Sequence, residues 1–174
     1  MLSWVRLMSY LRSYNKWEIP LIIICDIINT NIRFVRSDFM TIEEMAYIAG
    51  IIDGEGSIML LKFHNNQFPS PCISVASTSL ELLEWLKRKV GYGTIKAKKN
   101  YKPTNHENSY TYTIRYNNVI DLLDKIEPFL VIPSKKSRAQ MILSEYKQIT
   151  PRNGRYSNQL LLAKEDLYKR FMNV

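Results

Sequence analysis

The chain has 174 residues, of which 46% are hydrophobic and 23% charged, a composition that fits one globular domain and excludes a wholly disordered protein. Its 24 Lys and Arg exceed its 16 Asp and Glu. The net charge of +8 predicts a polyanionic partner, nucleic acid first, and the alternative is a merely soluble basic protein. Cys25 and Cys72 lie in apolar surroundings, which favours small buried hydrophobic residues over a disulfide framework. His64 and His106 lie 42 residues apart, and no Cys or His spacing typical of a zinc site is present.

Residues 1–40 are expected to form an N-terminal extension ahead of a single domain spanning 41–174. Residues 1–17 hold basic side chains and no acid, with apolar residues at helical spacing. They resemble an organellar transit segment, but we favour a short basic amphipathic helix packed on the domain or on nucleic acid. The apolar run at 21–28 is interrupted by Asp26 and is too short to span a bilayer. We therefore expect an intracellular protein, in the cytoplasm or an organelle, without a membrane partner.

A helix is predicted over 41–53, because Thr41 and Glu44 have the spacing of a capping box. One face is bulky and suits a core: Met45, Ile48, Ile51 and Ile52. The neighbouring face is nearly without side-chain volume: Ala46, Ala49, Gly50 and Asp53. A mid-helix glycine costs up to about 1 kcal/mol relative to alanine, which is tolerable where another element comes close to the backbone. A second helix and an internal strand are equally good candidates for that element.

Two carboxylates, Asp53 and Glu55, lie among glycines where this helix is expected to stop. The carboxyl end of a helix is negative, so a carboxylate there is disfavoured. A positive partner, such as a bound cation, would relieve the repulsion.

The rest of the chain predicts an α+β domain with an antiparallel sheet covered by helices on one face. Strands are expected over 57–63, 72–78, 94–99 and 110–116. Helices are expected over 79–90, 121–129, 134–149 and 159–171, and we write the order as α-β-β-α-β-β-α-α. Gly91 is the expected stop of the helix at 79–90.

The hairpin at 94–116 has two different faces. Tyr110, Tyr112, Ile114 and Tyr116 alternate with Thr111, Thr113 and Arg115, and Ile95 and Ala97 alternate with Lys96 and Lys98. Five basic residues (Lys96, Lys98, Lys99, Lys102, Arg115) against one acid (Glu107) leave a net charge of +4 on this segment. A basic two-stranded ribbon fits the DNA major groove. The alternative is a solvated basic face. Expected DNA contacts are Lys62, Asn66, Lys96, Lys98, Thr111, Thr113 and Arg115.

The segment IAGIIDGEG, from Ile48 to Gly56, resembles the motif that names the LAGLIDADG homing endonucleases, with Ile for the first Leu and Glu for the second Asp. The resemblance implies the fold of that family and a motif helix that packs against its twin at Gly50, with Ala46, Ala49 and Asp53 in the interface. It implies that Glu55 and the Gly54 carbonyl bind a divalent metal at the scissile phosphate. Asp53 matches the acid that caps and stabilises the helix pair.

A second stretch, Pro128-Phe129-Leu130 followed by Lys135 and Ala139-Gln140, resembles the family's other landmark, where a lysine lies close to the active site. Lys135 is therefore the candidate for the catalytic lysine, and Lys136 is the second choice. A phosphate contact at a helix N-terminus is the alternative role. Lys136 and Arg138 are further expected DNA contacts. The family often has a water-positioning glutamine where this chain has Ser77.

The resemblance implies a homodimeric, Mg²⁺-dependent, site-specific endonuclease that cleaves a long near-palindromic double-stranded DNA and propagates its intron. Mn²⁺ is expected to replace Mg²⁺, and Ca²⁺ to support binding without efficient cleavage. The alternatives are a maturase that binds intron RNA and a non-catalytic DNA-binding regulator. The presence of Glu55 and Lys135 favours the enzyme, because a regulator needs neither.

Overall fold

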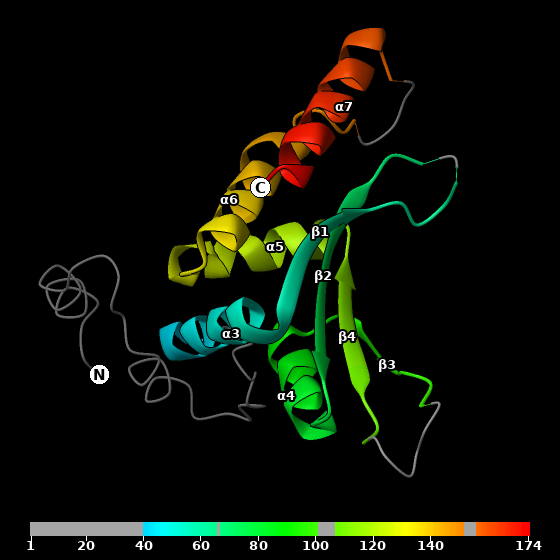
Figure 1. Cartoon of the computed structure of the whole chain (residues 1–174). Coiled ribbons are helices and arrows are strands. Elements are labelled where there is room, and N and C mark those ends of the chain that lie inside the picture. Colours follow the sequence, from blue (N-terminus) through cyan, green and yellow to red (C-terminus); the bar gives the residue numbers. More distant parts are fainter. Residues whose placement is uncertain (1–39, 66, 101–106, 152–155) are drawn as a thin grey trace, which may run out of the picture. The chain divides into compact units, whose positions relative to one another are not determined.

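The computed structural model describes residues 40–65, 67–100, 107–151 and 156–174, so the expectations for residues 1–39 and for Asn66 lie outside the described part of the chain. The elements, shown in Figure 1, are α3 (Ile42–Glu55), β1 (Gly56–Leu61), β2 (Ser70–Ser77), α4 (Leu80–Val90), β3 (Thr94–Ala97), β4 (Tyr110–Arg115), α5 (Asn117–Ile126), the 3-10 turn η1 (Glu127–Phe129), α6 (Pro133–Met141), the π-helical η2 (Ile142–Tyr146) and α7 (Asn158–Met172). Among the described residues three α-helices follow β4, as the three predicted ranges require, so the order is one helix longer than α-β-β-α-β-β-α-α. No described helix is long and apolar enough to cross a membrane.

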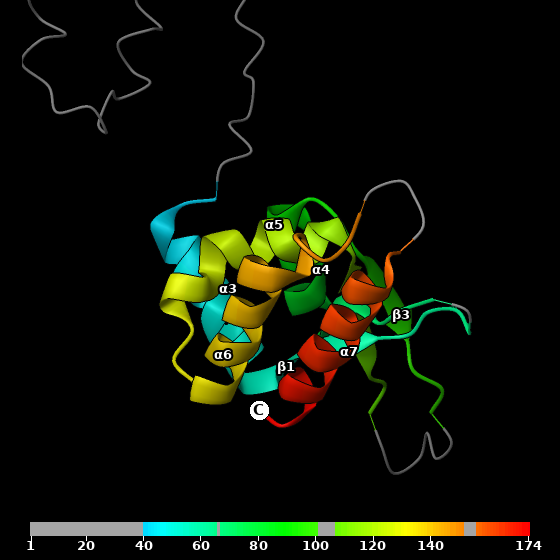
Figure 2. The same cartoon turned by 90° about the horizontal axis from the view of Figure 1, so that it is seen from above.

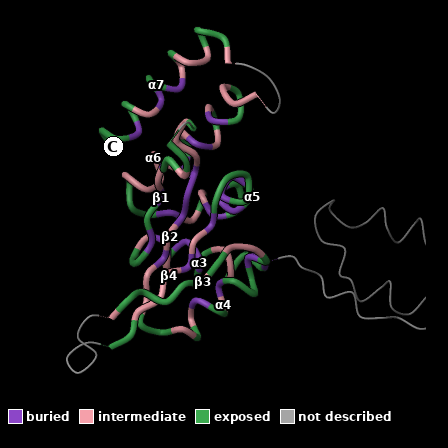
Figure 3. The backbone as a smooth tube through the Cα atoms, turned by 90° about the vertical axis from the view of Figure 1, so that its right-hand side faces the viewer, coloured by how far each residue is buried: buried purple, intermediate pink, exposed green. Residues whose placement is uncertain are grey.

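The four strands form one antiparallel sheet in the order β1-β2-β4-β3. Ile58 lies opposite Ile73, and Ile73 opposite Ile114, so one row of buried side chains crosses three strands. Helices α3, α4, α5 and α6 pack on this face and leave the other face of the sheet open (Figures 1 and 2). Buried residues gather along β2 and α5 (Figure 3). The predicted α+β class is confirmed.

Helix α3 begins as predicted but ends later. The Glu44 N–H donates to Thr41 Oγ1 at 3.3 Å and the Thr41 N–H to Glu44 Oε2 at 3.2 Å, which completes the capping box. The helix runs through Glu55 rather than stopping at Asp53, and the Gly56 N–H donates to the Ile52 carbonyl. A lysine side chain from α6 covers carbonyls at this end, which allows the extra residues to stay helical.

Of the other helix boundaries, those of α4 agree with the sequence prediction, and the end of α6 does not. Ser79 caps α4, and Gly91 ends it in the left-handed conformation at φ 85°. The helix expected over 134–149 instead widens into η2 after Met141. The Ser144 hydroxyl donates to the Gln140 carbonyl at 2.7 Å, and such back-bonding distorts the regular helical ladder.

Candidate active site and nucleic-acid interface

The end of α3 brings together residues from distant parts of the chain. Lys135, in the first turn of α6, donates from Nζ to the carbonyl of Ile52 at 2.8 Å and to that of Asp53 at 2.5 Å. The Val131 N–H donates to Asp53 Oδ2 at 2.7 Å. The stretch predicted to hold the second landmark therefore meets the motif helix directly.

The Lys135 ammonium supplies a positive partner for this helix end. The last carbonyls of a helix have no partners within the helix and carry its negative charge, so a cation in contact with them is stabilising. The sequence predicts a positive partner at this end, such as a bound cation, and the Lys135 ammonium is one positive partner that contacts it. Glu55 is exposed beside it, and its carboxylate forms no ion pair among the described residues.

The donor groups at this end fit a hard divalent cation. The Glu55 carboxylate and the Gly54 carbonyl are oxygen ligands of the kind that Mg²⁺ prefers. Apart from its chain neighbours and the backbone of its own helix, no heavy atom of the described chain lies within 4 Å of the place where a Cβ on Gly54 would stand, so the backbone there is open to a ligand. The described residues hold no cluster of three or more His, Cys, Asp or Glu. Oxygen atoms of water, of a phosphate or of a second copy of the chain would complete a metal shell built on Glu55 and Gly54.

The small face of α3 is only partly free. Ala46 and Gly50 are exposed, and no atom of another described element lies within 4 Å of a Cβ built on Gly50, so Gly50 does not pack against an internal strand. Ala49, however, is fully buried in the chain's own core, which removes its side chain from the predicted free face. Asp53 is half-buried, and its Oδ1 is enclosed without a hydrogen-bond partner among the described residues.

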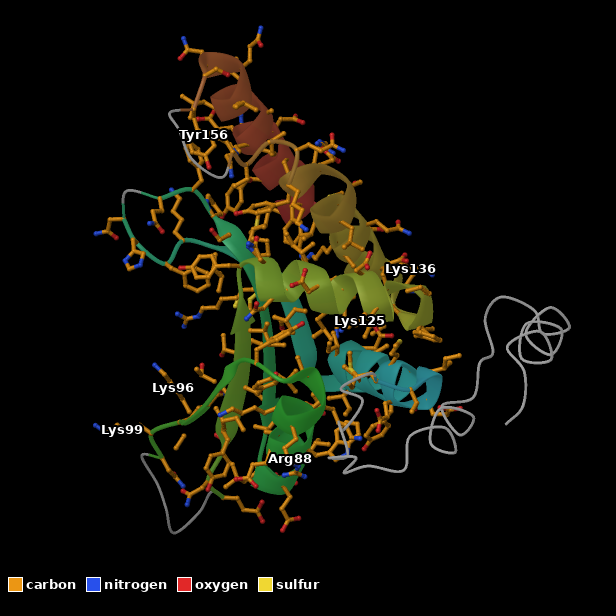
Figure 4. The ribbon with its side chains drawn as sticks, turned by 180° about the vertical axis from the view of Figure 1, so that it is seen from behind. Arg88, Lys96, Lys99, Lys125, Lys136 and Tyr156 are labelled. Carbon is orange, nitrogen blue, oxygen red and sulfur yellow. The ribbon has the colours of Figure 1, made fainter. Side chains whose placement is uncertain are left out.

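The open face of the sheet carries the predicted basic and hydroxyl side chains. Lys96 lies opposite Thr111, and Thr94 opposite Thr113, so the expected alternation holds. The lysines Lys62, Lys96 and Lys98 and the arginine Arg115 are exposed, whereas Thr111 and Thr113 are partly buried. Figure 4 shows Lys96 on the opposite side of the molecule from Lys125 and Lys136, which lie on the helices.

Two further predicted DNA contacts, Lys136 and Arg138, lie on α6, and Ser77 lies at the end of β2. Arg138 Nη1 donates to the Ile58 carbonyl at 3.4 Å, and its guanidinium lies 5.3 Å from the centre of the Phe171 ring. Arg138 therefore packs within the protein. Lys136, on α6, belongs to the helical side rather than to the open face. The Ser77 hydroxyl accepts from the Ser79 N–H at 3.1 Å, which commits it to the start of α4.

An aromatic cluster beside Arg115 was not predicted. The Arg115 guanidinium carbon lies 4.4 Å from the centre of the Phe63 ring, and that ring lies 5.2 Å from Tyr116. Tyr116 was expected to continue the buried row of β4, but the strand ends at Arg115 and Tyr116 turns out to 44% exposure. Its φ of 58° is a strained value for a residue other than glycine, at a typical cost of about 1–3 kcal/mol. Strand alternation gives no signal for such a turn.

Comparison with known proteins places this arrangement in a recognised architecture. Neither a protein-family model nor a curated protein sequence matches the chain. It is similar to the solved structure of the homing endonuclease I-CvuI in complex with its target in the presence of calcium, with a TM-score of 0.56, 16% identity, and coverage of 76% of this chain and 82% of that chain. It is also similar to I-CvuI with the I-CreI target in the presence of magnesium, in which the DNA is not cleaved (TM-score 0.55, 16% identity, 75% and 81% coverage).

A third similar structure is the LAGLIDADG homing endonuclease I-GzeII in complex with its DNA target (TM-score 0.52, 16% identity). The match covers 71% of this chain and 43% of that one, so the chain spans less than half of I-GzeII. The chain has the fold of the LAGLIDADG homing endonucleases.

Proposed function

We propose that the protein is a site-specific endonuclease that hydrolyses double-stranded DNA as a homodimer with Mg²⁺. The observation that carries the proposal is the contact of Lys135 Nζ with the carbonyls at the end of the helix that bears Glu55. A carboxylate and a fixed ammonium at one helix end are the groups needed to hold a metal and to neutralise charge at a phosphate. The basic open face of the sheet supports DNA as the substrate.

In this reaction the oxygen of a water molecule bonds to phosphorus, the bond from phosphorus to the leaving sugar oxygen breaks, and that oxygen gains a proton. Magnesium, when bound, neutralises negative charge and activates water. Glu55 and the Gly54 carbonyl are the groups that would hold it. Lys135 adds a fixed positive charge as negative charge builds on the phosphate. Mn²⁺ should also support cleavage, whereas Ca²⁺ should support binding alone.

A second copy of the chain completes the site in this proposal. One chain contributes one Glu55, and two DNA strands require two. The open surface at Gly50 gives a second α3 room to approach. A dyad-related dimer would cut a long near-palindromic site, across the minor groove and with short 3′ overhangs as the family resemblance implies.

The solved complexes of I-CvuI with DNA in the presence of calcium or magnesium support the choice of ligand and ion. Within the described residues, the proposed DNA contacts are Lys62, just after β1, and on the open face Lys96, Lys98, Thr111, Thr113 and Arg115. Lys136 stays a proposed contact at the start of α6, near Lys135. Intron RNA is the alternative partner.

Selection of cleavable sequences from a randomised duplex library with Mg²⁺ tests the proposal. We expect enrichment of one long near-palindromic sequence. Duplex binding without cleavage of any sequence would favour the regulator, and tighter binding to intron RNA than to any duplex would favour the maturase.

A further inference from the structure

The Arg115 guanidinium on the open face of the sheet stacks on the ring of Phe63, which in turn contacts the ring of Tyr116. Phe63 follows β1 and lies under the guanidinium, with 4.4 Å from its ring centre to the guanidinium carbon. Tyr116 follows β4 and contacts Phe63, with 5.2 Å between ring centres. Arg115 forms no ion pair among the described residues, so its charge is not used within the fold.

The backbone fixes this arrangement. The Tyr116 N–H donates to the Pro71 carbonyl at 2.9 Å, and the Val119 N–H donates to the Tyr116 carbonyl at 3.0 Å. These bonds hold Tyr116 at φ 58° and ψ −134°, where an L side chain is strained. The strained turn removes the Tyr116 ring from the helical face, where alternation would have placed it, and leaves it against Phe63.

A stacked guanidinium has its donors in one plane, with the edge away from the ring free to donate. Two parallel donors match the O6 and N7 acceptors of guanine in the major groove, and this is the commonest specific contact between proteins and DNA. A phosphate contact needs only a positive charge, which a lysine without an aromatic support supplies equally well. The aromatic support therefore favours base recognition.

We propose that Phe63 and Tyr116 are positioning residues that hold the Arg115 guanidinium for bidentate contact with one guanine in each half of the DNA site. This inference rests on the proposed DNA-endonuclease function. It assigns a specificity-determining role to two aromatic residues that touch neither the metal nor the scissile phosphate.

The test is selection of bound sequences from a randomised duplex library with Ca²⁺, using the native protein and single variants. Arg115→Ala should lose the preference for guanine at one position per half-site. Phe63→Leu and Arg115→Lys should lose it at the same position, with affinity for the native site falling on the order of tenfold. Phe63→Tyr, which keeps a ring, should retain the native preference. Phe68→Leu is the matched control, because Phe68 lies in the same loop but contacts Tyr156 instead.

Retention of the native base preference by Phe63→Leu would overturn the proposal. So would a uniform loss of affinity for all sequences in Arg115→Ala with a salt slope lower by about one, the signature of a phosphate contact. Both results leave the endonuclease function intact. A native protein that selects no duplex sequence would instead overturn that function and this inference with it.

Discussion

Lys164 on α7 is a charged residue that the proposed DNA chemistry leaves unused. Its side chain is buried among aromatic rings, with Nζ 4.7 Å from the ring centre of Tyr146, 5.2 Å from that of Tyr156 and 5.6 Å from that of Phe68. No carboxylate pairs with it among the described residues. Burial lowers the pKa of Lys164 from 10.5 to about 8.

This lowered pKa predicts that the fold becomes more stable as pH rises. The unfolded chain keeps the ordinary lysine pKa, so between pH 8 and 10.5 it binds more protons than the folded chain, and the free energy of unfolding increases with pH. From about pH 7 to 9.5 the gain from this group is about 2 kcal/mol. The Lys164→Met variant should lack this pH-dependent gain in the free energy of unfolding. Urea unfolding of both proteins across this range checks the difference, and parallel pH profiles would contradict the assignment.

The sequence predicts single residues well where one local pattern sets their place and poorly where tertiary contacts do. The capping pair Thr41 and Glu44 and the stop at Gly91 follow from short-range backbone chemistry. Lys135 could be placed near the motif only through the family resemblance, and nothing local indicated that its ammonium contacts helix carbonyls. The surroundings of Lys164 combine three segments, so no window of sequence reveals them.

At the scale of the element, two substitutions at Gly50 in α3 should have different effects, one on the stability of the single chain and one on its association. Gly50→Ala adds a methyl group to open space in the single chain, so it should stabilise the fold by up to about 1 kcal/mol. Gly50→Leu should instead abolish association, because a bulky side chain separates the two helices. Sedimentation equilibrium with thermal unfolding separates the two effects. A native chain that stays monomeric at micromolar concentration, with and without DNA, would contradict the dimer.

We expect the open face of the sheet to contribute more to DNA affinity than the helical side does. Lys96→Ala, on the open face, should weaken binding by about 1–3 kcal/mol if Lys96 contacts a base. Lys125→Ala is the matched control, since it removes the same charge from α5 on the helical side (Figure 4). Fluorescence anisotropy with a selected duplex measures both. Equal losses for the two variants would place recognition outside the sheet.

The elements show where periodicity is a sufficient guide. The alternation of Lys96, Thr111 and Thr113 predicts the two faces of the hairpin from local sequence alone, and the strand register agrees with it. The π-helical widening after Met141 and the turn at Tyr116 depend on a hydroxyl inserted into the helix and on a strained backbone, which alternation does not encode. Burial of Ala49 depends on which neighbouring element covers it, and a helical wheel alone places it on the free face.

At the scale of the whole molecule, charge predicts how affinity responds to salt. Two copies carry 2 × 8 = +16, so the proposed dimer should contact many phosphates and release their counterions. The slope of log affinity against log salt should be steeper than about −5, with loss of about 1,000-fold or more between 50 and 200 mM salt. Anisotropy titrations over this range measure the slope, and a slope near −1 would mean that the charge serves solubility alone.

The measurement that tests the account most directly is cleavage of a selected DNA site by Glu55→Gln beside the native protein. The substitution keeps the size of the side chain and removes the charge proposed to hold Mg²⁺, so cleavage should disappear while binding in Ca²⁺ survives. Asp53→Asn is the control, and it should lower stability or dimerisation more than metal affinity, because Asp53 accepts from the Val131 N–H. Cleavage by Glu55→Gln within about threefold of the native rate would contradict the proposed metal site and the enzyme built around it.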